Sequence, residues 1–356
     1  MEKLARNFPR VGKIIQQLLN SDEPSVRYKI RAGVLGENPR SQSIRKLREA
    51  IRRSPRVRQL LSRRDKKGRI EPVRHVYRKW FGAHWVLPAL ADLGYPPGDE
   101  KLAPVLDQVL ECWLGDWTTR DVVWNNDEDL RKCKGVPVIN GRARRCASQQ
   151  SNALYAALML GFVDDRVHRL ADLLMRWQWP DGGWNCDRDP KAHVSSFHES
   201  IIPLRALSLY ARTTDSRKAV GASKRAAELF LCRKLFKRRR DGKVMDLDFV
   251  LLHYPCYWHY DVLMGLKVMA EAGFIRDPRC KDALDWLESW QLPGGGWAAE
   301  DKYWRSLNPL QQFGSRFMGA GRQKENERVD HGRRADRIEG GGESEPCYVN
   351  SVLTEP

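Results

Sequence analysis

Two seven-residue segments of this 356-residue chain, Gln178-Trp-Pro-Asp-Gly-Gly-Trp184 and Gln291-Leu-Pro-Gly-Gly-Gly-Trp297, decide the fold. Both fit the pattern Q-x3-G-x-W, and both follow an amphipathic segment of helical periodicity. The glycines permit a tight reversal of the chain, and the Gln amide and Trp ring can tie neighbouring units together. Similar turn-like segments are found at 65–69, 115–117 and 241–244. The sequence therefore predicts an internal repeat with these turns at equivalent places.

Helices of two kinds flank the turns. Those before a turn alternate apolar and charged residues, as in VHRLADLLMRWQW, whereas those after it are more apolar, as in SNALYAALMLG. Strand-like alternation is nearly absent, so an all-α fold is expected. An apolar inner layer and an amphipathic outer layer, repeated along the chain, are typical of an α/α toroid or an α-solenoid.

The two Q-x3-G-x-W segments resemble the QW motifs of the terpenoid cyclases, among them the squalene cyclases. The toroid that carries these motifs is also the fold of the protein prenyltransferase β subunits. The resemblance covers residues 60–310 and implies an α/α toroid with a substrate cavity at its centre. It also implies structural roles for Gln178, Trp184, Gln291 and Trp297. The D-x-D-D acid motif of the cyclases is missing, so the resemblance indicates the fold more strongly than the reaction.

Positive charge is concentrated at the start of the chain. The formal net charge is +17, and residues 1–79 hold 23 Lys and Arg against 7 Asp and Glu, a balance of +16. Residues 1–60 are expected to form a basic helical cap that resembles HEAT repeats. This cap predicts attraction to an anionic membrane, with nucleic acid as a less favoured partner.

Three further segments complete the predicted organisation. Residues 61–315 are assigned to the toroid repeats, and the polar, glycine-rich residues 316–345 to a disordered linker. Residues 346–356 look like the start of a truncated final helix. The eight Cys lie scattered in mostly apolar patterns, and no signal peptide or membrane span is evident. A cytoplasmic protein is expected, with peripheral membrane contact left open.

The polar residues at the predicted starts of the inner helices are the candidates for chemistry. His198, Glu199, His259 and Asp261 fall at nearly one depth and are predicted to be an acid–base group. Further polar or aromatic residues near the same helix starts are expected to bind substrate: His84, Gln149, Asn152 and Trp258. The alternative is that such residues only cap their helices.

Three cysteines form a possible metal set. Cys133 and Cys146 flank a glycine-containing loop, and Cys186 directly follows the first QW turn. The protein prenyltransferases hold zinc with an Asp, a Cys and a His, which makes zinc the cofactor to test. A structural role for these thiols is the alternative.

These observations lead to three functional hypotheses. The first is an enzyme of the terpenoid cyclase or prenyltransferase type, which acts on an apolar isoprenoid substrate by acid–base chemistry. The second is a zinc-dependent transferase or hydrolase on the same fold. The third is a non-catalytic helical scaffold that binds nucleic acid or an anionic membrane through its basic N-terminal helices.

Overall fold

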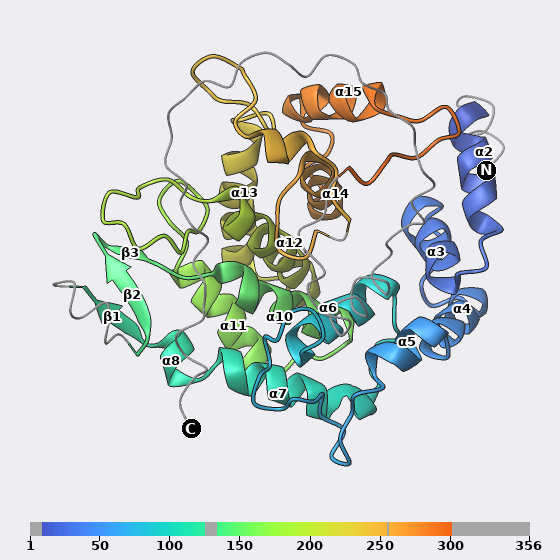
Figure 1. Cartoon of the computed structure of the whole chain (residues 1–356), viewed down its shortest axis with the longest axis horizontal. Helices are drawn as coiled ribbons and strands as arrows, with labels where there is room; N and C mark the ends of the chain where they lie inside the picture. Colours follow the sequence, from blue (N-terminus) through green and yellow to red (C-terminus); the bar gives the residue numbers. More distant parts are fainter. Residues whose placement is uncertain (1–8, 125–133, 255, 301–356) are drawn as a thin grey trace.

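The computed structural model describes residues 9–124, 134–254 and 256–300, and most of them are helical (Figure 1). The all-α class expected from the sequence is therefore confirmed in outline. No described helix combines the length and the apolar character needed to cross a bilayer. The predicted linker 316–345 and final helix 346–356 lie outside the described residues.

The N-terminal part consists of short helices. They are α2 (Pro9–Leu19), α3 (Pro24–Tyr28), the π-helical turn η1 (Lys29–Val34), α4 (Gln42–Arg52) and α5 (Pro55–Leu60). Ser41 and Ser54 cap α4 and α5 by accepting hydrogen bonds from Ile44 and Val57 backbone N–H groups.

Longer helices form the rest of the molecule in two layers. The inner layer contains α6 (Ala83–Leu93), α10 (Ala147–Met159), α12 (Phe197–Thr214) and α14 (Val262–Ala272), which pack side by side in that order. The outer layer contains α7 (Ala103–Trp113), α11 (Asp165–Arg176), α13 (Arg217–Leu231) and α15 (Lys281–Ser289). Each outer helix packs against the inner helix that precedes it in the chain (Figure 1).

Short elements join these helices. They are the 3-10 turns η2 (Glu100–Leu102), η3 (Leu247–Val250) and η4 (Pro278–Cys280), and the four-residue helix α8 (Asp116–Thr119). A small sheet between α8 and α10 contains β1 (Asp121–Val123), β2 (Val136–Ile139) and β3 (Arg142–Ala143). β1 pairs with β2 in parallel, and β2 pairs with β3 in antiparallel fashion around the Asn140-Gly141 turn, where both residues have positive φ.

The two QW turns make the same contact but differ in burial. The Trp184 indole N–H donates to the Leu174 carbonyl at 2.9 Å, and the Trp297 indole N–H donates to the Leu287 carbonyl at 2.7 Å. Each ring thus closes the last turn of its outer helix from ten residues downstream. Trp184 is packed into the core and is 1% exposed, whereas Trp297 is 37% exposed.

The N-terminal helices bridge the two ends of the layered region. The Ser25 hydroxyl donates to the Leu93 carbonyl at 2.7 Å, at the end of α6. On the other side, Ile14 of α2 packs against the second QW turn, where a Cβ on Gly295 would lie 2.7 Å from the Ile14 side chain. Figure 1 shows α2 to α5 as a separate group of helices beside the layers.

Candidate functional site

Two short backbone pairings bring Cys146 and Cys186 together. Arg144 and Asn185 form a parallel bridge, and the Arg145 N–H donates to the Asn185 carbonyl at 3.2 Å. Because Arg145 and Asn185 directly precede Cys146 and Cys186, these pairings place the two cysteines in the same region. Cys146 is also the residue that precedes the first turn of α10.

Glu199 joins the two thiols from the first turn of α12. Its Oε2 accepts a hydrogen bond from the Ser148 N–H at 3.0 Å, and the Cys186 Sγ lies 3.8 Å from its Oε1. The ligand atoms of Cys146, Cys186 and Glu199 all lie within 4.8 Å of one another, and the described residues contain no other group of three such ligands. Two of the three predicted metal residues thus lie together, whereas Cys133 lies outside the described residues.

The surroundings of this thiol–carboxylate centre are mostly buried. Glu199 is 6% exposed, and burial raises the pKa of its carboxyl group above the usual value. The Arg145 guanidinium lies near enough to oppose this shift, and it donates to the Gln149 and Gln150 side-chain oxygens at 3.0 and 3.1 Å. Gln149, which the sequence places at the site, therefore contributes by orienting Arg145.

Tyr77 also lies at the centre. Burial raises the pKa of its hydroxyl group, and the charges of Cys146, Glu199 and Cys186 raise this pKa further. A hydrogen bond with Gln149 acts in the opposite direction and lowers the pKa. Sequence reasoning missed both Tyr77 and Arg145. Arg145 directly precedes a candidate metal ligand, which is a usable signal, but Tyr77 lies in an irregular segment before α6 and nothing in its local pattern indicates this position.

The predicted acid–base residues separate into different places. His198 and His259 lie together, with ring centroids 5.9 Å apart, and the Trp258 ring stacks on His259 at 3.9 Å. The His198 Nδ1 accepts a hydrogen bond from the Tyr260 N–H at 2.8 Å. Burial lowers the pKa of His198 to about 4, so this ring is neutral near pH 7.

Asp261 is not part of the thiol–carboxylate centre; it caps α14. Its Oδ1 accepts from the Met264 N–H at 2.7 Å, and its Oδ2 accepts from the His253 N–H at 2.9 Å. The residue is fully buried. The capping alternative therefore describes Asp261, whereas the Glu199 carboxylate accepts from the neighbouring helix α10 and does not cap its own helix.

Two predicted substrate-binding residues are enclosed in the core. His84 is 1% exposed, and its Nδ1 accepts from the Trp113 indole N–H at 3.0 Å. Burial lowers the pKa of His84 to about 3. Asn152 is 5% exposed within α10.

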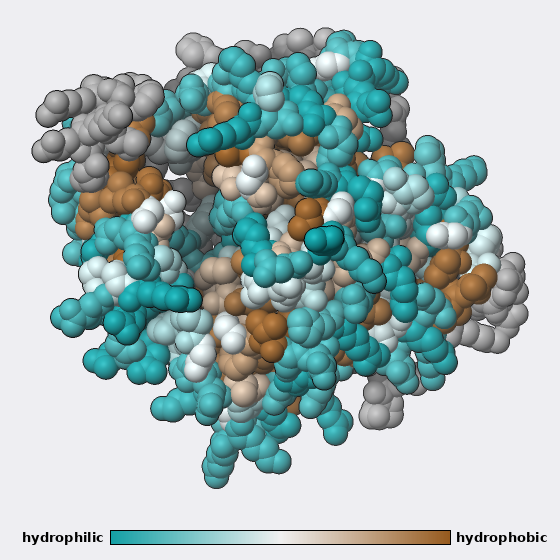
Figure 2. Space-filling view, turned by 180° about the vertical axis from the view of Figure 1, so that it is seen from behind, coloured by the Kyte–Doolittle hydropathy of each residue, from teal (hydrophilic) through white to brown (hydrophobic). Residues whose placement is uncertain are grey.

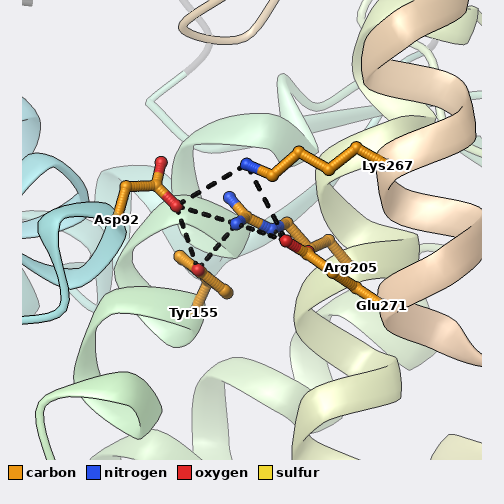
Figure 3. A network of polar contacts seen from close by, with 5 residues as sticks. All are labelled: Asp92, Tyr155, Arg205, Lys267 and Glu271. Carbon is orange, nitrogen blue, oxygen red and sulfur yellow. Dashed lines mark hydrogen bonds and ion pairs between the residues drawn. The ribbon is translucent and has the colours of Figure 1, made fainter. Parts of the chain in front are cut away.

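A second polar cluster, which the sequence did not reveal, joins all four inner helices (Figure 3). We call it the ion network; it consists of Asp92, Tyr155, Arg205, Lys267 and Glu271. Arg205 donates to Glu271 at 2.5 and 3.0 Å, to Asp92 at 2.7 Å and to the Tyr155 hydroxyl at 2.7 Å. Lys267 lies 3.9 Å from Asp92 and 3.8 Å from Glu271.

Comparisons with protein-family models, curated proteins and solved structures find no match to this chain.

Proposed function

We propose that this protein is a zinc-dependent enzyme, a transferase or hydrolase, whose metal is held by Cys146, Cys186 and Glu199. The supporting observation is that one ligand atom from each residue lies within 4.8 Å of the others. Thiolate and carboxylate are both zinc ligands, and three protein ligands leave a fourth position for water or substrate, as catalytic zinc sites do. When bound, the metal would supply Lewis-acid chemistry at that fourth position.

Charge balance favours a divalent cation at this place. Two thiolates and one carboxylate carry three negative charges, which a buried site does not tolerate without compensation. A zinc ion would leave one negative charge, and the Arg145 guanidinium offsets it. Arg145 is suited to this role because its hydrogen bonds go to the neutral side chains of Gln149 and Gln150.

The chain's own residues would orient the ligands. The Ser148 N–H holds one Glu199 oxygen at 3.0 Å, which leaves the second oxygen on the side of the thiols. The Tyr77 hydroxyl, whose raised pKa keeps it protonated at neutral pH, would donate a hydrogen bond toward the ligands or the substrate.

The order of helix contacts supports an α/α toroid as the scaffold, and aromatic rings support an apolar substrate. Trp80 stacks on Tyr257 with ring centroids 3.6 Å apart, and Trp85 lies edge-on to both. We propose an isoprenoid chain as the apolar substrate that would meet these rings. An acid–base enzyme without metal remains the second candidate, favoured by the His198–His259 pair beside Trp258.

Metal analysis of purified protein tests the proposal. Wild-type protein should contain about one zinc per chain, and Cys186→Ser and Glu199→Gln should lose it. The matched control is Cys256→Ser, because Cys256 also lies next to a carboxylate, that of Asp261, at the start of an inner helix. The control should keep its zinc. Wild-type protein without stoichiometric zinc after growth in zinc-supplemented medium, or equal loss in the control, would show that the proposal is wrong.

A further inference from the structure

The segment 40–79 carries most of the positive charge of the molecule. It holds 16 Lys and Arg against 3 Asp and Glu, a balance of +13 out of the net +17. It includes α4, α5 and a turn closed by the bridge between Arg64 and Ile70. We call this segment the basic edge, since α4, α5 and the following turn lie along the lower right edge of Figure 1.

Most of these cations point to solvent. Ile44, Leu47 and Ile51 bury one face of α4, so the opposite face carries the charge. Several cations of the basic edge are exposed and form no ion pair with any described residue: Arg40, Arg45, Lys46, Arg58, Arg63, Lys66, Lys67, Arg74 and Arg78. Hydrophilic side chains also cover the lower edge in the opposite view (Figure 2).

Charge elsewhere on the surface is more often balanced. On the outer helices and the turn η4, Arg166 pairs with Asp107 at 2.7 Å, Arg279 with Glu228 at 2.6 Å, and Lys281 with the carboxylate of Asp285 four residues later. Mutual repulsion makes a cluster of like charges costly for the folded protein alone. The basic edge therefore has the character of a surface that meets an anionic partner.

A pocket of about 430 Å³ opens within this region. Arg74 supplies the unpaired cation of its wall, whereas the Arg69 guanidinium is paired with Asp65 at 3.0 Å. Glu111 supplies one acid, and Val73 and Val76 supply apolar surface. Trp117, 38% exposed, completes the wall. The Gln108 side chain forms three hydrogen bonds of 2.9 to 3.0 Å with the backbone of Ile70 and Val73, which fixes this part of the pocket wall.

Cations beside apolar wall and a half-exposed indole suit the boundary between a phosphate headgroup and an acyl chain, where Trp is favoured. Single-stranded nucleic acid is a poorer fit, because its binding uses exposed aromatic rings for stacking. Within the basic edge His75 and Tyr77 are partly buried, so Trp117 is the exposed ring that the pocket offers, which is too little for a row of stacked bases.

We propose that the basic edge docks this protein on an anionic lipid bilayer and that the Arg69–Arg74 pocket receives a lipid phosphate headgroup. This inference goes beyond the zinc-dependent activity and does not require it. It places the protein at the surface where an apolar substrate would be dissolved.

Vesicle co-sedimentation of the full chain tests the inference. Binding is expected to vesicles of phosphatidylcholine with phosphatidylglycerol, not to phosphatidylcholine alone, and it should weaken steeply as salt rises. The variant Arg45→Gln/Lys46→Gln/Lys66→Gln/Lys67→Gln removes four charges of the basic edge. Each cation near a membrane surface contributes about a fivefold change in binding, so four removed charges predict a loss of about 600-fold, and a loss below about tenfold would contradict the inference.

A matched control removes four exposed cations from another region: Arg217→Gln/Lys218→Gln/Arg239→Gln/Lys243→Gln. It should bind vesicles nearly as well as wild type. The pocket variant Arg74→Gln should reduce binding to phosphatidylglycerol vesicles beyond the loss caused by the single surface substitution Lys46→Gln. An excess of inorganic phosphate at constant ionic strength should not displace the protein, since the bilayer supplies the multiple contacts.

Several outcomes would overturn the inference. They are equal loss in the two quadruple variants, equal binding to both kinds of vesicle, and tighter binding to duplex DNA or RNA than to the anionic vesicles. Thermal unfolding and zinc content are measured on the same samples. Unchanged zinc in the basic-edge variant separates failure of this inference from failure of the zinc proposal.

Discussion

The thiol–carboxylate centre and the ion network both place polar side chains between the inner helices, but they balance charge differently. In the ion network, the cations Arg205 and Lys267 face the anions Asp92 and Glu271, and the side chains satisfy one another. In the thiol–carboxylate centre, three groups that can each become negative lie within 4.8 Å, with Arg145 as the nearby cation.

The pKa values of Asp92 in the ion network and Glu199 in the thiol–carboxylate centre shift in opposite directions. Burial alone would raise the pKa of Asp92, but the charges of Arg205, Lys267 and Lys29 outweigh it and hold the pKa well below the usual range. For Glu199, burial prevails and the pKa is raised. In the ion network each acid has a cationic partner, which indicates a structural role. In the thiol–carboxylate centre several potential anions lie together in a buried place, which indicates a cation site.

Arg205→Met should break the ion network with the largest effect. Arg205 is 6% exposed, and its loss leaves Asp92 and Glu271 without their central cation. Removing one partner of a fully buried pair costs about 3 kcal/mol or more of the free energy of unfolding. The side chains of Asp92 and Glu271 are 39% and 35% exposed, so solvent screening reduces the expected loss to about 2 kcal/mol. Urea unfolding monitored by circular dichroism measures it. A loss below about 1 kcal/mol would contradict a structural role for the network.

Zinc should stabilise the metal-free protein through the thiol–carboxylate centre. At a zinc concentration about 100 times the dissociation constant, the expected gain is about 2.7 kcal/mol. Thermal unfolding with and without zinc measures this gain after chelation. Cys146→Ser should abolish the gain and Arg205→Met should keep it, since the ion network is separate. A gain that survives in Cys146→Ser would argue against this metal site.

Acidification should change the stability contributions of Asp92 and Glu199 in opposite directions. The folded pKa of Asp92 is lowered, so its stabilisation is present above its unfolded pKa of 3.8 and is lost as pH falls toward the folded value. Wild-type protein should therefore lose stability below about pH 4 more steeply than Asp92→Asn. Chemical unfolding across this pH range tests it, and parallel profiles for the two proteins would contradict it.

Glu199→Gln in metal-free protein tests the raised pKa of the Glu199 carboxyl group. The folded pKa of Glu199 is raised above 4.5, so the stability it contributes is present below that value and declines as pH rises toward the folded pKa. Above pH 4.5 the free energy of unfolding of wild type should decline relative to Glu199→Gln. An unchanged difference between the two proteins across this window would show that Glu199 titrates normally.

Lys267→Met should have the smallest effect. Lys267 is 43% exposed on its side chain and lies 3.8 to 3.9 Å from its acidic partners, so solvent screens the pairs. We expect a change of less than about 1 kcal/mol in the free energy of unfolding. A loss as large as that of Arg205→Met would mean that the network acts as one unit rather than through its central arginine.

Sequence patterns could predict the helices but only part of the site. The amphipathic and apolar segments matched the outer and inner helices, because helical periodicity is local. Their positions beside predicted turns make Cys146 and Cys186 metal candidates, and the structure brings them together. The sequence predicts that Glu199 acts in acid–base chemistry with His198 and Asp261, yet its carboxylate lies with the thiols, since partners across helices depend on side-chain direction.

Composition and helical periodicity are enough to predict the all-α class, the two kinds of helix, the repeated QW turns and the position of the basic edge, because these signals act over short distances. Packing between distant segments places Glu199 beside two cysteines, makes Asp261 a helix cap and lets Arg205 join four helices. Those outcomes depend on residues up to 113 positions apart, as in the Arg205–Asp92 contact. Contacts over such separations arise from packing, which no local pattern encodes.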